Sequence, residues 1–330
     1  MIDVNKLLDS KEYDFLRTNE HLRNKIIFLT LGGSHAYGTK VETSDVDIRG
    51  CCFNRKTDLL GLSNFEVIED NSTDTVIYSI RKLFNLLLNC NPNVIEMLGN
   101  KEYYYMSEPG RLLLENKHLF LSKRAIKSFG GYAFAQLNRL NNALGRNKDE
   151  EGLRENLERS LKLNLLTMNE RYTALPEGGI KYYIKDNELS CNINLEGFPV
   201  NQFNSILNEQ SNILKTYNKL NHRNTKKDIP HLCKHAMHLI RLYMMEIDIL
   251  EKEEIITYRE GKDHDLLMSI RNGNFLTPQG LFGKSFDDLL NDYKKKFDYA
   301  AENTSLPDMP NMKDAEELLI TINEYSLRQG

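Results

Sequence analysis

The chain has 330 residues, of which 40% are hydrophobic and 27% are charged, and its formal net charge is −4 at pH 7. These values are ordinary for a globular protein with a sizeable core, and the length favours about two domains. The slightly acidic balance excludes a globally basic surface that would hold a long nucleic acid, and leaves room only for a local basic groove.

Cysteine usage and the N-terminus bear on the cellular compartment. The five cysteines are odd in number and include no CxxC pair, which disfavours a disulfide scaffold and a structural zinc site. Residues 1–12 carry no apolar signal-peptide core, and no stretch approaches the roughly 20 apolar residues of a membrane span. We expect a cytoplasmic protein with reduced thiols and no membrane association, and the sequence leaves its oligomeric state open.

The most informative stretch follows one or two short amphipathic helices expected within residues 4–23. Residues 26–31 are apolar, β-branched or aromatic and stop abruptly at two glycines, a pattern typical of a buried strand that enters a turn. Such a turn offers main-chain N–H groups, and the next residue adds a hydroxyl, an arrangement that commonly binds phosphate. The residues expected to contact a phosphate-bearing ligand are Gly33, Ser34, Thr39 and Ser44.

Two aspartates follow the turn in an alternating pattern. If residues 44–48 are a strand, Asp45 and Asp47 share one face, with Cα atoms about 6.6 Å apart. Two like charges this close repel each other unless a cation lies between them. Carboxylate oxygens beside a phosphate suit Mg²⁺, with Mn²⁺ as an alternative. Arg49 continues the same face, where it could contact phosphate oxygens or neutralise an aspartate.

Other interpretations of this stretch fit less well. Gly33 to Lys40 resembles the Walker A spacing, but the order Gly38-Thr39-Lys40 misplaces the lysine. No GxGxxG follows the strand, which disfavours a dinucleotide site. An exposed β-edge with solubilising acidic residues would explain one aspartate more readily than two on one face beside a glycine turn.

The remaining chain is first mixed and then mainly helical. A third strand is expected over residues 74–80 and a helix over 80–88. After residue 109, helical periodicity covers residues 111–128, 132–144, 153–168 and 200–220, while residues 180–194 have the pattern of a β-hairpin.

Residues 231–250 carry an apolar helical stripe with a separate polar row. Lys234, His238 and Arg241 fall at i, i+4 and i+7, so they could lie along a row of phosphates or form a solvated basic face. His231 and His235 have a zinc-compatible spacing, but no Glu completes an H-E-x-x-H arrangement.

These features together resemble the DNA polymerase β-like nucleotidyltransferase superfamily. The resemblance is carried by Gly33-Ser34, a ten-residue spacer and the segment Asp45-Val46-Asp47-Ile48. The longer segments 33–39 and 44–50, together with 91–98 and 234–242, are similar to a bacterial and phage branch labelled only as predicted nucleotidyltransferases. The motif covers about the first third of the chain.

The resemblance implies an α+β fold. An N-terminal nucleotidyltransferase domain, residues 1–108, would contain a small mixed β-sheet with flanking helices. A mainly α-helical domain, residues 109–330, would follow, with the hairpin near residues 180–194. In the superfamily a third metal-binding carboxylate comes from a neighbouring strand, and Asp74 is our assignment. The alternatives are Glu69, Asp70 and Glu96, or a purely turn-closing role for Asp74.

The implied reaction is metal-dependent transfer of a nucleoside monophosphate, AMP foremost, from a nucleoside triphosphate to a hydroxyl acceptor, with release of pyrophosphate (EC 2.7.7 type). The catalytic and metal-binding residues would be Asp45, Asp47 and Asp74. The triphosphate would be bound by the glycine turn and by Arg49, Lys234, His238 and Arg241. The acceptor stays open between RNA or tRNA, a protein and a small molecule. The alternatives are a non-catalytic nucleotide- or RNA-binding module and a toxin–antitoxin type partner protein.

Overall fold

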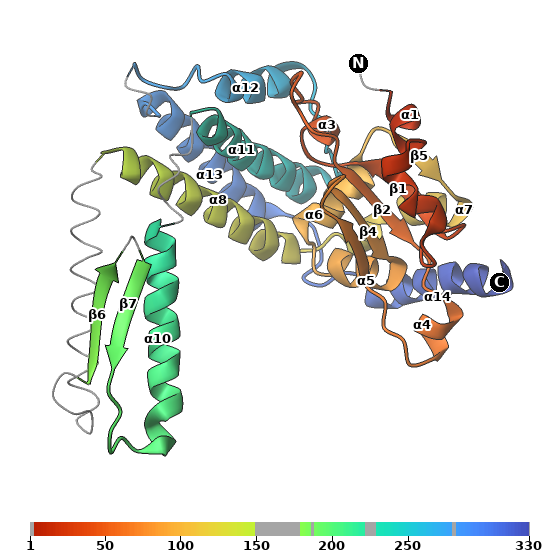
Figure 1. Ribbon diagram of the computed structural model, residues 1–330. Helices are drawn as coiled ribbons and strands as arrows, with labels where there is room; N and C mark the ends of the chain where they lie inside the picture. Colours follow the sequence, from red (N-terminus) through yellow and green to blue (C-terminus); the bar gives the residue numbers. More distant parts are fainter. Residues whose placement is uncertain (1–2, 149–178, 186–187, 222–228, 279–281, 330) are drawn as a thin grey trace. The chain divides into compact units, whose positions relative to one another are not determined.

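The computed structural model describes residues 3–148, 179–185, 188–221, 229–278 and 282–329 (Figure 1). The chain forms two compact units, one that combines Met1–Arg139 with Ile229–Gly330 and one that comprises Leu140–Asp228. The domain boundary expected after residue 108 stays a prediction. The helix expected over residues 153–168 lies outside the described residues.

A mixed five-stranded sheet forms the centre of the first unit. β1 (Ile26–Leu31) pairs antiparallel with β2 (Ile48–Cys52) and with β5 (Tyr103–Met106). β2 pairs in parallel with β4 (Thr75–Ser79), and β3 (Val67–Asp70) is antiparallel to β4. The strand order is therefore β3-β4-β2-β1-β5. With the helices around it, this mixed sheet confirms the expected α+β fold.

Both faces of the sheet are buried, which explains why β1 is almost entirely apolar. On one face, Leu29, Ile48 and Ile77 share a core with the N-terminal helices. On the other face, Phe28 and Cys51 pack into a larger core that draws on helices from both ends of the chain. The helices in the two cores include α1 (Val4–Leu8), α2 (Phe15–Thr18), α5 (Ile80–Leu87), α7 (Glu108–Glu115) and α14 (Met312–Gln329).

The first unit also contains longer helices from the C-terminal part of the chain and several short helices (Figure 1). α11 (Ile229–Lys252) packs against α12 (Gly261–Arg271) and α13 (Lys284–Asn303). The short elements are η1 (Lys11–Tyr13), α3 (Gly33–Tyr37), α4 (Lys56–Leu60), α6 (Pro92–Ile95), η2 (Glu96–Gly99) and η3 (Lys117–Phe120). Of the helices described, none combines the length and apolar character that a bilayer crossing requires.

The second unit has its own small sheet. β6 (Ile180–Lys185) pairs antiparallel with β7 (Glu188–Ile193), in the segment where the sequence indicates a hairpin. α10 (Val200–Asn221) follows, and α8 (Arg124–Lys148) runs from the first unit into the second.

A buried carboxylate in α11 stands out from its apolar surroundings. Glu246 is 0% exposed, and neither carboxylate oxygen has a hydrogen-bond partner within the described part of the chain. Burial raises the pKa of Glu246 to about 9. An unpaired charge here would be costly, so the folded protein keeps this side chain protonated at neutral pH.

This burial predicts a pH dependence of stability. Between the usual pKa of Glu and about 9, the folded chain binds one proton that the unfolded chain releases, so stability present at low pH is lost as the pH rises. From pH 5.5 to pH 7.5, the free energy of unfolding of the native protein should fall by up to about 1.4 kcal/mol per pH unit more than that of the Glu246→Gln variant. Urea unfolding at several pH values measures this difference. Glu251→Gln, an exposed position on the same helix, is the control, and parallel profiles for the native protein and Glu246→Gln would contradict the prediction.

Candidate active site

The glycine turn opens a short helix at the end of β1. Gly32 is extended, and Gly33 has a φ of +55°, a left-handed conformation that favours glycine. α3 then runs to Tyr37 and ends at Gly38, whose φ of +77° gives the usual left-handed helix end. Ser34 and His35 lie half-buried in the first turn of α3. The first main-chain N–H groups of a helix have no acceptor within it, so this turn keeps donors for an anion.

Asp47 packs directly against this turn. The Gly32 N–H donates to the Asp47 carbonyl oxygen at 2.8 Å, which joins the end of β1 to the residue before β2. A Cβ added to Gly33 would overlap Asp47 Oδ2. The absence of a side chain at Gly33 therefore lets the carboxylate lie against the helix start.

The parallel pairing of β2 and β4 brings a second carboxylate to the same place. Ile48 is in register with Thr75, so Asp47 and Asp74, the residues just before them, are neighbours at one edge of the sheet. Asp74 has a φ of +46°, and its carbonyl oxygen accepts a hydrogen bond from the Ile48 N–H at 3.2 Å. The sheet thus brings the two aspartates together.

The negative charges of Asp47 and Asp74 are only partly neutralised by nearby cations. Burial, followed by a hydrogen bond with Asp74, raises the pKa of Asp47 to about 7, whereas that hydrogen bond lowers the pKa of Asp74. The Arg49 Nη2 atom lies 3.1 Å from Asp74 Oδ1 and 3.9 Å from Asp47 Oδ1. The two carboxyl groups therefore share one proton near neutral pH, as closely spaced carboxylates do.

The segment before Asp47 is not the strand that the sequence indicates. β2 begins at Ile48, and residues 44–47 are outside the strand, with Asp45 exposed. Local contacts hold this loop instead. Ser44 Oγ accepts a hydrogen bond from the Val41 N–H at 2.9 Å, and Arg271 Nη1 donates to the Thr39 carbonyl oxygen at 2.7 Å. Residues 44–48 alternate in polarity although residues 44–47 form a loop, so the sequence pattern placed the strand start too early.

Comparison with known proteins agrees with this geometry. Residues 9–162 match the family described as RlaP, the RNA repair pathway DNA polymerase beta family. This match is consistent with the DNA polymerase β-like nucleotidyltransferase superfamily that the sequence motif resembles. The match supports, at a coarse level, a nucleotidyltransferase-like enzyme. No curated protein and no solved structure matches the chain.

The row of cationic residues predicted on α11 divides into two parts in the structure. Lys234 is exposed, and its charge lowers the pKa values of Asp47 and Asp74, which places it within electrostatic reach of both. Arg241 is instead 1% exposed, with Nη2 3.2 Å from Glu96 Oε2. His238 lies beside Arg241, at 3.4 Å from Nδ1 to Nη2.

The alternative third carboxylates have other partners or positions. Glu96 is buried and pairs with Arg241. Asp70 accepts hydrogen bonds from the N–H groups of Ser72 and Thr73, and so closes the turn after β3. Glu69 is exposed on β3. Asp74 alone of these four aligns with Asp47, and within the described ranges no three His, Cys, Asp or Glu side chains gather into a group that could hold a metal.

Two contributors to the site carry no recognisable sequence signal. Arg271 anchors the loop after α3 from the end of α12. Tyr258 packs its ring against Gly38, where an added Cβ would lie 3.0 Å from Cζ. Both come from the far part of the chain, and neither belongs to a motif.

The Gly33 geometry yields a direct prediction. Gly33→Ala should lower the free energy of unfolding by at least about 1–2 kcal/mol, because alanine is strained at this φ and its Cβ would displace the Asp47 carboxylate. Urea unfolding measures the loss. Gly131→Ala is the matched control, since its Cβ meets open space and alanine favours the helix. Equal effects of the two substitutions would show that the close approach is not needed.

Proposed function

We propose that this protein transfers a nucleoside monophosphate, AMP foremost, from a nucleoside triphosphate to a hydroxyl acceptor and releases pyrophosphate. The observation that carries the proposal is the meeting of Asp47 and Asp74 beside the Gly32–Gly33 turn, with the cation of Lys234 nearby. A phosphate-binding turn and adjacent carboxylates are the parts that nucleotidyl transfer requires, and the match of residues 9–162 to a DNA polymerase beta family supports the same reaction.

The donor set fits a magnesium ion. Carboxylate oxygens are the ligands that Mg²⁺ prefers, and the shared proton of Asp47 and Asp74 marks an excess of negative charge that a divalent cation would compensate. Asp47 and Asp74 would hold Mg²⁺ or Mn²⁺, and the exposed Asp45 would join them by turning toward the bound ion. When bound, the metal would neutralise triphosphate charge and lower the pKa of the attacking hydroxyl.

The chain's own residues would orient the reactants. Main-chain N–H groups at the start of α3 would donate to phosphate oxygens, and Ser34 would add its hydroxyl. Lys234 would bring a positive charge to the triphosphate, and Arg49 would exchange its contacts with the aspartates for phosphate oxygens. No nucleophilic side chain is needed, because positioning and charge compensation supply most of the rate.

The acceptor proposed for the first test is an RNA hydroxyl. The description of the matched family names an RNA repair pathway, and we take RNA as the acceptor on that basis. The protein would be incubated with each α-labelled nucleoside triphosphate, Mg²⁺ and an RNA that ends in a 3′-hydroxyl. A 3′-deoxy RNA and a protein acceptor would run beside it. Label in RNA with release of pyrophosphate is the expected result.

Removing the carboxylates should stop the reaction. Asp47→Asn and Asp45→Asn should each lower transfer by about 10²-fold or more, because the cation that would compensate charge at the transition state loses a carboxylate ligand. Glu42→Gln, an exposed substitution in the same loop, is the matched control and should keep full activity. Melting temperatures of all variants separate loss of the site from loss of the fold.

The same assay distinguishes the competing interpretations. Undiminished transfer in both aspartate variants would refute the assigned site. Binding of nucleotide without release of pyrophosphate, by the native protein and with every acceptor, would point to a non-catalytic binding module.

A further inference from the structure

The helix that carries the phosphate-binding turn is too short to be stable alone. α3 has five residues, and a helix of this length gains too few hydrogen bonds to offset its nucleation cost. Its orientation must therefore come from tertiary contacts. The described residues include several such contacts, and they converge on Tyr37, the last residue of α3.

Tyr37 is held by side-chain and main-chain hydrogen bonds. Its hydroxyl donates to Glu96 Oε1 at 2.9 Å, and its carbonyl oxygen accepts from the Arg259 N–H at 3.1 Å. The side chain is 7% exposed. Glu96 is itself fixed, because its carbonyl oxygen accepts a hydrogen bond from Thr257 Oγ1 at 2.6 Å. The end of α3 is thus tied to η2 through Glu96 and to the segment after α11 through Arg259.

Arg241 occupies the centre of these contacts. Its Cζ lies 3.5 Å from the centroid of the Tyr37 ring, and its Nη2 lies 3.2 Å from Glu96 Oε2. The guanidinium therefore stacks on the ring and pairs with the carboxylate that also accepts from Tyr37. Planarity suits arginine to both contacts at once, and lysine offers no equivalent face.

A buried pair of this kind is poor evidence for a gain in stability alone. Removing Arg241 and Glu96 from water costs free energy, and the attraction between their charges does little more than offset that cost. A well-packed pair of apolar side chains in the same place often stabilises a fold equally well. What the pair does supply is geometry, since it fixes a ring on α3 relative to a helix more than 200 positions further along the chain.

We propose that Arg241 is a positioning residue for the active site, which sets the orientation of α3 through Tyr37 and thereby holds the Gly32–Gly33 turn against Asp47. The effect on catalysis rests on the proposed function, in which the turn binds phosphate, whereas the orientation of α3 by Arg241 does not. The family match ends at residue 162, so α11 and the segment after it would complete a site that the matched residues do not contain by themselves.

Local hydrogen exchange tests the structural part without any substrate. The N–H groups of Ala36, Gly38 and Thr39 donate to carbonyl oxygens within or just before α3. In Arg241→Lys, these amides should exchange at least about tenfold faster, while amides of β1 and β2 keep their protection. Unchanged exchange in a folded Arg241→Lys variant would overturn the proposal.

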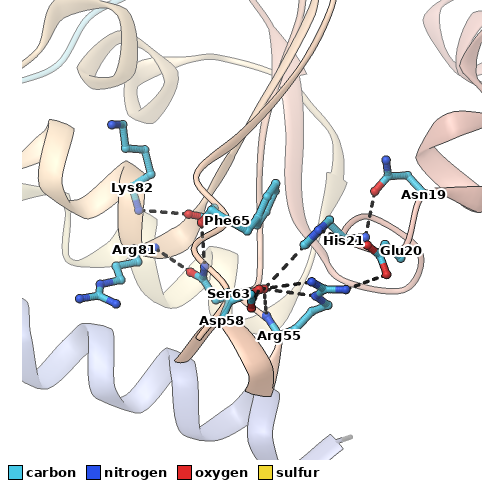
Figure 2. A network of polar contacts seen from close by, with 11 residues as sticks. Asn19, Glu20, His21, Arg55, Asp58, Ser63, Phe65, Arg81 and Lys82 are labelled. Atoms are coloured by element: carbon cyan, nitrogen blue, oxygen red, sulfur yellow. Dashed lines mark hydrogen bonds and ion pairs between the residues drawn. The ribbon is translucent and has the colours of Figure 1, made fainter. Parts of the chain in front are cut away.

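The matched control is a second arginine beside a buried carboxylate. Figure 2 shows Arg55 next to Asp58, a network that also includes His21 and Ser63. Arg55 Nε lies 3.4 Å from Asp58 Oδ2, and the Asp58 side chain is 0% exposed. Arg55→Lys should alter exchange around α4 and leave residues 36–39 unchanged. Faster exchange of residues 36–39 in this control as well would show a general loosening rather than positioning by Arg241.

A second variant keeps the test decisive if Arg241→Lys does not fold. Tyr37→Phe removes only the hydroxyl that donates to Glu96 and preserves the ring beneath Arg241. It should also raise exchange at residues 36–39, by several-fold. A folded Tyr37→Phe variant with native exchange there would contradict the proposal.

Pyrophosphate release provides the functional readout. In Arg241→Lys it should fall about 10- to 100-fold, while Arg55→Lys stays within about twofold of the native rate. If the native protein releases no pyrophosphate, the proposed function fails, yet hydrogen exchange still decides whether Arg241 orients α3. Faster exchange of α3 in Arg241→Lys with an undiminished rate of release would reject the catalytic importance of that orientation.

Discussion

Repulsion between two neighbouring carboxylates is the constraint on which the site depends. The parallel register of β2 and β4 places Asp47 and Asp74 side by side, and the turn at Gly33 presses one of them against the start of α3. Arg49 and Lys234 offset only part of this charge, since the pair still shares a proton. Two carboxylates this close would destabilise the fold if their role were purely structural. The arrangement therefore favours a binding site in which a bound cation supplies the missing positive charge.

The parts that hold this site come from both ends of the chain. The sheet provides the aspartates, whereas α11 provides Lys234, whose charge acts on them, and Arg241, which stacks on Tyr37 of α3. Arg271 and Tyr258 fix the loop that follows α3. The geometry of the candidate site is therefore a property of the unit that combines residues 1–139 with 229–330, rather than of the matched family segment alone.

The sequence predicted those structural features that are set by residues close together in the chain. The apolar run of β1 and the glycine turn follow from local patterns, whereas the α+β fold and the assignment of a carboxylate at position 74 came from the family resemblance. Periodicity failed for Arg241, because a helical row at i, i+4 and i+7 does not reveal that one member meets a buried glutamate from another segment. It also placed the start of β2 too early, since residues 39–44 are held by Arg271 and by their own turn. Long-range contacts of this kind leave no trace in a single sequence.

Anomalous diffraction from crystals grown with Mn²⁺ and a non-hydrolysable ATP analogue would test the site most directly. We expect a manganese peak within coordinating distance of the Asp47 carboxylate, with the triphosphate against residues 32–34 and Arg49 moved away from Asp74. A triphosphate bound elsewhere on the molecule, or manganese distant from Asp47, would contradict the assignment of this edge of the sheet as the active site.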